Sequence, residues 1–392
     1  MPLLRSVTVG GLRSYGPDPV TVGLAPLTLV FGPNSAGKSS LLSVLPLLRQ
    51  SAGRRDRLVM RGPLVDAGSF RSAVHRHRED VPITLGLSWS GPDGAPPRSL
   101  VASYRWDVVR RVAVRDTVEL DSGGRRIRLE GATSAWGDPE TAAAGAYLVE
   151  EAVEVLERVA LLGPMRARPD RAVALGAGDG RDVGPTGEGT AEILHDRPDL
   201  LAQVNEWCER LGFGYEVRML EPVSRDLVLA AGDLAVMGLV DLRSDPPVLV
   251  SPHAVGFGVG QLLPVITQCL LSRDGVVIVE QPEVHLHPRL QAAVGDLFVD
   301  TVVAGRAQVL VETHSEHLVL RLLRRVREGQ LAADDLAVLY VDLHEDGAAH
   351  VRRLRVDGDG ELVDGWPGSF FDERLDDVLP RRRPAQPPGG AT

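Results

Sequence analysis

A glycine-rich stretch near the start of the chain has the residue types and spacing that bind phosphate. Its residues are Gly32, Pro33, Asn34, Ser35, Ala36, Gly37, Lys38, Ser39 and Ser40. The first eight fit the pattern G-x-x-x-x-G-K-[ST] at every position. In such a loop, backbone N–H groups bind phosphate oxygens, the lysine reaches the β- and γ-phosphates, and the next hydroxyl binds Mg²⁺. The stretch therefore predicts a site for a nucleotide such as ATP, together with Mg²⁺.

The segments on either side of this loop support the prediction. Residues 27–31 form a short apolar run typical of a strand, and residues 39–50 have leucines at helical spacing. Lys38 is also the single lysine among 43 basic residues, the others being arginine. A GC-rich codon bias explains the arginines. It does not explain the one lysine, whereas a crowded phosphate site does, because it needs a compact charge on a thin side chain.

A second segment, 275–283, supplies the acid that a phosphate loop needs for its metal. Residues 276–279 are all apolar, as in a strand buried on both faces of a parallel sheet, and Glu280 follows them. Ligands of open α/β sheets bind at the carboxyl ends of the strands. Glu280 is therefore predicted to hold Mg²⁺ together with Ser39, directly or through water.

A third apolar run, 307–311, ends close to a histidine. A helix predicted over 289–304 separates this run from the segment before it. His314 is expected at the same sheet edge, where it would contact the γ-phosphate or orient water. The pair His285 and His287 leaves a zinc site open as an alternative, although no third ligand is evident.

Together these segments resemble a known family. The strings that carry the resemblance are GPNSAGKSS, VVIVEQPEVHLHPRLQ and VLVETHSEHL. They are similar to ABC-type ATPases of the OLD-like (overcoming-lysogenization-defect) group, in the branch called AAA family ATPases, for which EQPE-x-HLHP is rather specific. Residues 161–169 and the segment 366–374, WPGSFFDER, also resemble that branch. The resemblance covers most of the chain and is weakest in the middle.

The resemblance implies a fold and an assembly. The fold is α/β, a P-loop ABC-ATPase-like head with a mixed sheet, flanking helices and an antiparallel β-subdomain. Two heads of a homodimer, or of a higher homo-oligomer, would enclose two nucleotides, each capped by the signature loop of the other head. The matching loop here is 255–261, with Gly258, Gly260 and Gln261 as binding residues, followed by a helix over 262–271. The family often has serine where Gly260 stands.

The residue after the metal acid departs from the ABC pattern. ABC ATPases usually have a catalytic glutamate there, whereas this chain has Gln281, which cannot take a proton. The nearest spare carboxylate is Glu283. One possibility is that Gln281, Glu283 and His314 position or activate the water. The other is that hydrolysis is slow, because a general base typically raises the rate by about 10²–10⁴-fold. EQPE is common in this branch, so the departure does not predict an inactive enzyme.

The distance along the sequence between Lys38 and Glu280 indicates a head split by a compact insertion. We expect residues 1–140 to form the first half of the head and residues 141–245 to form an inserted helical and β region. Residues 246–345 would complete the head, and 346–392 would form a hairpin and tail. Helices are predicted at 147–162 and 190–211, the second interrupted at Pro198. Strands are predicted at 81–89, 100–108, 112–120, 125–129, 216–220, 226–230, 235–242, 336–341 and 350–356.

The composition of the chain excludes several classes of protein. The chain has 392 residues, 44% of them hydrophobic, a formal net charge of −10 and two cysteines. These values exclude a disordered chain, a disulfide framework and a general nucleic-acid coat. No apolar run is long enough to span a membrane and no signal peptide is evident, so a cytoplasmic protein without membrane contact is expected.

Partners beyond a second head stay open. A helix expected at 316–330 carries four arginines, which form either a solvated basic face or a contact for DNA or a partner protein. Several OLD-like proteins carry a TOPRIM nuclease domain, but after His314 no Glu and Asp-x-Asp set stands at the ends of apolar strands in this sequence. A nuclease or other effector is therefore expected to act in trans.

Two functions agree with these residues. The first is an ATPase whose nucleotide-driven head dimerisation and hydrolysis act on DNA or a partner; the resemblance suggests DNA repair or anti-phage defence. The second is a nucleotide-gated switch or scaffold that recruits an effector protein with little hydrolysis. The turnover number distinguishes them. The sequence contains no motif that recognises the base of the nucleotide, so it does not distinguish ATP from GTP.

Overall fold

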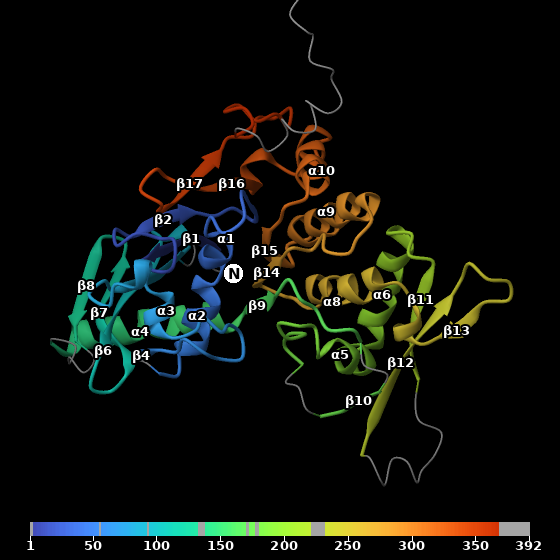
Figure 1. Ribbon diagram of the computed structural model, residues 1–392, viewed down its shortest axis with the longest axis horizontal. Coiled ribbons are helices and arrows are strands. Elements are labelled where there is room, and N and C mark those ends of the chain that lie inside the picture. Colours follow the sequence, from blue (N-terminus) through green and yellow to red (C-terminus); the bar gives the residue numbers. More distant parts are fainter. Residues whose placement is uncertain are drawn as a thin grey trace, which may run out of the picture.

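The computed structural model describes residues 3–54, 56–91, 94–131, 138–169, 172–176, 180–220 and 232–367. Its strands form three sheets, and the sheet that carries the phosphate loop lies between the other two in Figure 1. None of the helices within these ranges combines the length and the apolar character of a membrane span. The strand predicted at 226–230 and the tail from 368 onward lie outside the described residues.

The central sheet has six strands in the order β17-β16-β3-β15-β14-β9. Their bounds are β3 Leu27–Phe31, β9 Val159–Leu162, β14 Gly275–Glu280, β15 Ala307–Glu312, β16 Leu336–Leu343 and β17 Ala349–Leu354. Neighbouring strands are parallel except β16 and β17, which form an antiparallel hairpin. Strands β3, β14 and β15 confirm the strands predicted before Lys38, before Glu280 and before His314.

Alternate residues of the parallel strands face two different hydrophobic cores. Ile278 and Leu310 pack into one core, whereas Val277 and Val311 pack into the other. Side chains alternate along a strand, so a strand covered on both faces needs apolar residues at successive positions. This explains the unbroken apolar runs that mark these strands in the sequence.

Helices cover both faces of the central sheet (Figure 1). The first core is shared with helices α1 Lys38–Leu42, α2 Val44–Ser51 and α4 Pro139–Glu157. The second core is shared with helices α5 Thr190–Asp196, α6 Pro198–Arg210, α8 Phe257–Leu271, α9 Pro288–Val303 and α10 Glu316–Arg327. The interruption predicted at Pro198 is confirmed, because this residue begins α6.

The two outer sheets are antiparallel. The larger has the order β2-β1-β5-β6-β7-β4, with β8 also paired to β7, and it is the predicted β-subdomain. Its bounds are β1 Leu4–Gly10, β2 Val20–Gly23, β4 Arg57–Leu58, β5 Ile83–Trp89, β6 Arg98–Asp107, β7 Val112–Ser122 and β8 Arg125–Glu130. The smaller consists of β10 Ala172–Ala174, β11 Tyr215–Leu220, β12 Leu234–Asp241 and β13 Val248–Val250.

Two predicted helices are wrong in part. Residues 159–162, expected to end a helix, form β9 and pair with β14. A short apolar run suits a buried strand as well as a buried helix, so periodicity does not separate them. The helix expected at 39–50 is divided at Ser43 into α1 and α2. Pro46 has no N–H to donate to Leu42, which interrupts the helical ladder at this point.

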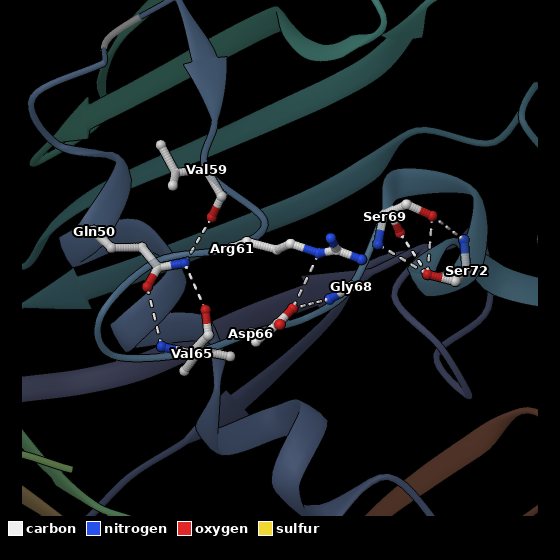
Figure 2. A network of polar contacts seen from close by, with 8 residues as sticks. All are labelled: Gln50, Val59, Arg61, Val65, Asp66, Gly68, Ser69 and Ser72. Carbon is white, nitrogen blue, oxygen red and sulfur yellow. Dashed lines mark hydrogen bonds and ion pairs between the residues drawn. The ribbon is translucent and has the colours of Figure 1, made fainter.

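Gln50, in the last turn of α2, fixes the loop that follows it. Its Nε2 donates to the carbonyl oxygens of Val59 (2.7 Å) and Val65 (3.1 Å), and its Oε1 accepts from the Val65 N–H (Figure 2). The loop continues to Ser69 and Ser72, which form the capping box of α3 Phe70–Ala73. These bonds attach the helices after the phosphate loop to the edge of the larger antiparallel sheet.

Candidate functional site

The phosphate loop turns sharply between β3 and α1, and two positions require glycine. Gly32 has a φ of 143° and Gly37 a φ of 116°, which L side chains rarely adopt. A Cβ on Gly32 would lie 2.0 Å from the Val341 carbonyl oxygen, and a Cβ on Gly37 would lie 2.5 Å from Ser14 Oγ. Close contacts with β16 and with the loop after β1 therefore explain both glycines of the motif.

Lys38 begins α1 and is buried, with 4% of its surface exposed. Its Nζ donates to the carbonyl oxygens of Gly32 (3.1 Å) and Pro33 (2.7 Å). Burial lowers the pKa of Lys38, whereas the negative charges of Glu312 and Glu283 oppose that shift. Within the described ranges, no carboxylate oxygen lies at ion-pair distance from this amine, so its charge is available to a phosphate.

The loop opens into a pocket of about 470 Å³, a volume in the usual range for small ligands. Its lining residues are Arg13, Ser14, Asn34, Ser35, Gly37, Lys38, Ser39, Ser40, Gln281, Glu312 and His314. The structure thus brings the predicted loop together with Gln281 and His314. The sequence did not predict Arg13, Ser14 or Glu312 in this site. Glu312 had a signal, since it directly follows the apolar run 307–311, but Arg13 had none.

Glu280 and Glu312 end neighbouring parallel strands and are register partners. Each lies two residues beyond a member of the first core, Ile278 or Leu310, so both side chains lie on the α1 face of the sheet. Burial raises the pKa of Glu280 to about 7, and the Glu312 charge adds to this rise, whereas Arg13 and Arg166 oppose it. The predicted metal acid is therefore one of two carboxyl groups behind the phosphate loop.

The raised pKa of Glu280 predicts a pH-dependent loss of stability in the ligand-free protein. Because the folded pKa is about 7 and the ordinary value is 4.5, the folded state holds this proton more tightly, and stability falls as pH rises between these values. Relative to Glu280→Gln, the wild-type protein should lose about 2 kcal/mol between about pH 5 and about pH 8. Urea unfolding without Mg²⁺ measures this. A difference that stays constant over that range would contradict the assignment.

Glu283 does not line the pocket and instead holds His314. Its Oε1 accepts from the His314 backbone N–H at 2.6 Å, which joins the segments that follow β14 and β15. Burial lowers the pKa of the His314 imidazole, and the positive charge of Lys38 lowers it further. His314 is therefore neutral near pH 7 and retains one donor and one acceptor nitrogen for a phosphate or a water.

Arg166 joins the end of β14 to α8. Only 3% of the surface of this residue is exposed. It donates to the carbonyl oxygens of Gly163, Gln261, Glu280 and Gln281. The Gln261 Nε2 donates back to the Arg166 carbonyl oxygen at 2.7 Å. Burial lowers the pKa of Arg166 to about 10, so it remains charged near neutral pH. The side chain of Gln261, a predicted signature residue, is thus used inside its own chain.

The predicted signature loop is the first turn of a helix. Because α8 begins at Phe257, Gly258 and Gly260 are helical, and the prediction that the helix starts at 262 is wrong. A Cβ on Gly260 would lie 2.9 Å from Pro169 Cδ. A serine at this position would collide with Pro169, which explains the departure from the family pattern. Neither glycine lines the phosphate pocket of the same chain.

The four arginines of α10 all form ion pairs within the chain, with three carboxylates. Arg321 and Arg325 pair with Asp296 of α9, Arg324 and Arg325 pair with Glu328, and Arg327 pairs with Glu361. These pairs favour the interpretation of a solvated basic face over a contact for DNA.

The alternative zinc site has no support in the described part of the chain. His287 is the N-cap of α9, and its Nδ1 accepts from the Arg289 backbone N–H. No group of three or more His, Cys, Asp or Glu side chains in that part is arranged to hold a metal by itself.

The oxygen atoms around the pocket fit Mg²⁺ bound together with a nucleotide. In such sites Mg²⁺ takes one or two carboxylates, and phosphate oxygens and waters complete the shell. Ser39 and Glu312 line the pocket and offer a hydroxyl and a carboxylate. Glu280 does not line it, but its carboxylate lies on the same face of the sheet as that of Glu312, its register partner. One oxygen of Glu312 is buried without a hydrogen-bond partner among the described residues.

Comparison with known families gives a match to part of the chain. Residues 226–321 match the family model described as "AAA domain, putative AbiEii toxin, Type IV TA system". The match covers 96 of the 392 residues, so it is a likeness of this part of the chain to that family. The matched segment includes α8, β14, α9 and β15, with Gln281 directly after β14 and His314 two residues after β15. No curated protein matches this chain in sequence.

Solved structures of SMC heads resemble nearly the whole chain. An Smc head bound to the C-winged helix domain of ScpA is 14% identical, with a TM-score of 0.55, over 91% of this chain and 98% of that chain. The chain therefore has the fold of an SMC head domain. The SMC head domain from Thermotoga maritima is 12% identical, with a TM-score of 0.46, over 90% and 100% of the two chains. An Smc head from Pyrococcus furiosus with an extended coiled coil, bound to the C-terminal domain of ScpA, is 13% identical, with a TM-score of 0.48, over 91% and 97%.

This likeness to an SMC head confirms the α/β fold class predicted from the sequence. In this head the phosphate loop, Gln281 and His314 stand at the carboxyl ends of β3, β14 and β15, where open α/β sheets bind ligands.

Proposed function

We propose that this head binds Mg-ATP and hydrolyses it, as an OLD-like ABC-type ATPase. The observation that carries the proposal is the pocket in which Lys38, Ser39, Gln281 and His314 come together. A phosphate loop alone binds phosphate, whereas here Gln281 and His314 line the same pocket as the loop and would be available to a γ-phosphate and its attacking water.

The proposed reaction is an attack of water on the γ-phosphorus, with loss of ADP. The new bond forms to the water oxygen while the bond to the β–γ bridging oxygen breaks, and the proton that the water loses passes to an oxygen of the phosphate product. Lys38 neutralises the charge that develops on the phosphoryl group, and His314 donates to a γ-phosphate oxygen. The Gln281 amide orients the water. Mg²⁺, held by Ser39 and Glu280, would supply further positive charge to the phosphates.

We also propose that two heads pair around two nucleotides, with the first turn of α8 from one head over the nucleotide of the other. Gly258 and Gly260 stand outside the pocket of their own chain, which supports this role. The output would be a change in head pairing that acts on an effector protein or on DNA, in DNA repair or defence against phage. Because the α10 arginines are paired internally, we place any DNA contact elsewhere.

Steady-state phosphate release by the full chain, with and without double-stranded DNA, tests the proposal. Lys38→Ala is expected to lower turnover by about 10²-fold or more, because the lysine stabilises the transferred phosphoryl group. Arg353→Ala, which removes an exposed cation on β17, is the matched control and should retain wild-type turnover. Equal rates for wild type and Lys38→Ala would refute hydrolysis at this site.

The second candidate is a nucleotide-gated switch that recruits an effector with negligible turnover. Two observations favour it: residue 281 is a glutamine, and the neighbouring Glu283 is engaged by the His314 N–H instead of facing the pocket. The two candidates differ in a direct measurement. ATP-dependent dimerisation without phosphate release above the Lys38→Ala level would establish the switch.

A further inference from the structure

Glu312 occupies a place in the pocket that the phosphate-loop motif does not account for. It ends β15, which lies between the phosphate-loop strand β3 and β14. Helix α1, which carries Ser39, packs against β15. Glu312 is therefore one strand closer to the phosphate loop than Glu280 is, and it lines the pocket although only 2% of its surface is exposed.

The carboxylate of Glu312 is not satisfied by the protein. Its Oε2 is buried and has no hydrogen-bond partner in the part of the chain that the structure describes. Lys38, the nearby cation, donates to two loop carbonyls instead. The hydroxyl of Tyr15 is also buried without a partner; burial raises the pKa of Tyr15, and the Glu312 charge adds to the rise. A buried unpaired charge is costly, and a bound cation would offset that cost.

We propose that Glu312 is a second carboxylate of the magnesium site, which would hold the ion together with Ser39 and Glu280. The proposal rests on the proposed function, because the ion enters with the nucleotide phosphates. Glu280 and Glu312 are register partners on strands that run about 4.8 Å apart, so both can reach one ion or its waters. Mg²⁺ takes oxygen ligands of this kind.

The proposal differs from a structural role in what it predicts for the ligand-free protein. If Glu312 served as the counter-ion of Lys38, then Glu312→Gln would lower the thermal stability. If Glu312 awaits a metal, the same isosteric change removes a buried unpaired charge and should raise the melting temperature without nucleotide. A lower melting temperature would overturn the proposal.

Metal affinity gives the direct test, with Mn²⁺ as the probe and electron paramagnetic resonance as the readout. Mn²⁺ is titrated into the full chain saturated with ADP. Glu312→Gln is expected to weaken Mn²⁺ binding by about 10- to 100-fold. Glu192→Gln is the matched control, because it removes a buried carboxylate on α5, outside the pocket, and should leave Mn²⁺ binding unchanged. ADP binding in EDTA is measured in parallel and should be equal in all three proteins.

The outcomes separate this proposal from the proposed function. Equal Mn²⁺ affinity in wild type and Glu312→Gln, with ADP bound by both, would overturn the second carboxylate and leave nucleotide binding intact. Unchanged Mn²⁺ affinity with slower turnover would also overturn it. That result would instead indicate that Glu312 acts on the water that attacks the γ-phosphorus. A wild-type chain that binds neither ADP nor ATP would refute the proposed function itself. If Glu312→Gln does not fold, Glu312→Asp, with its shorter carboxylate, should still weaken Mn²⁺ binding measurably.

Discussion

Replacing Gln281 by glutamate is expected to raise the rate of ATP hydrolysis by about 10²-fold, since a general base typically contributes about 10²–10⁴-fold. Gln281 lines the phosphate pocket, and its main chain is held on both sides. Its N–H donates to the Glu312 carbonyl oxygen, and its own carbonyl oxygen accepts from Arg166. Glutamate has the shape of glutamine, so the new carboxylate would take the place of the amide. It could then accept the proton of the attacking water.

Glu280 and Glu312 should make a glutamate at position 281 a better base. The charges of Glu280 and Glu312 should raise the pKa of a new carboxyl at 281, and a base works best when its pKa is near the working pH. Single-turnover phosphate release at saturating Mg-ATP is the measurement, with Gln281→Ala as the control that should not be accelerated. An unchanged rate in Gln281→Glu, with ATP still bound, would mean that residue 281 does not face the attacking water.

Replacing Arg166 by lysine is expected to lower the free energy of unfolding by about 3 kcal/mol. The arginine is buried and donates to four backbone carbonyl oxygens from three different nitrogen atoms. A lysine keeps the charge but has one nitrogen, which cannot reach all of these acceptors from one position. Several buried carbonyl groups at the end of β14 and on α8 would then lose their donor.

Arg168 provides a matched control for this experiment. It lies two residues further along the same segment but is exposed, so Arg168→Lys should change the stability by less than about 0.5 kcal/mol. Urea unfolding of the three proteins measures the difference. If Arg166→Lys were as stable as Arg168→Lys, the hydrogen bonds of the Arg166 guanidinium would not be what holds β14 to α8.

The parts of the site that could be predicted from the sequence are those with local causes. The turn at Gly32 and Gly37 follows from backbone angles and close contacts that few other residues tolerate, so the motif itself predicts the geometry. The strands that end at Glu280 and Glu312 are covered on both faces, which gives them continuous apolar runs that stand out in the sequence.

Other site residues depend on contacts between distant segments. Arg13 reaches the pocket from the loop after β1, and Arg166 acts on carbonyl groups about 100 residues further along the chain. Neither lies in a motif that explains its contacts. The start of α8 was misplaced for a related reason: glycines usually indicate a loop, whereas the collision that a side chain at Gly260 would cause with Pro169 becomes visible only in the folded structure.

The placement of β3 in the central sheet has a consequence for how the protein is made. Both neighbours of β3, β15 and β16, are formed by residues beyond 306. As the chain leaves the ribosome, the strand that precedes the phosphate loop therefore has no partner in its sheet until most of the protein has been synthesised. Unpaired strands tend to aggregate, so the nascent chain depends on delayed folding or on chaperones at this stage. Gln281, Glu312 and His314, which line the phosphate pocket, are also made late, so the proposed nucleotide site is incomplete until these residues have been synthesised.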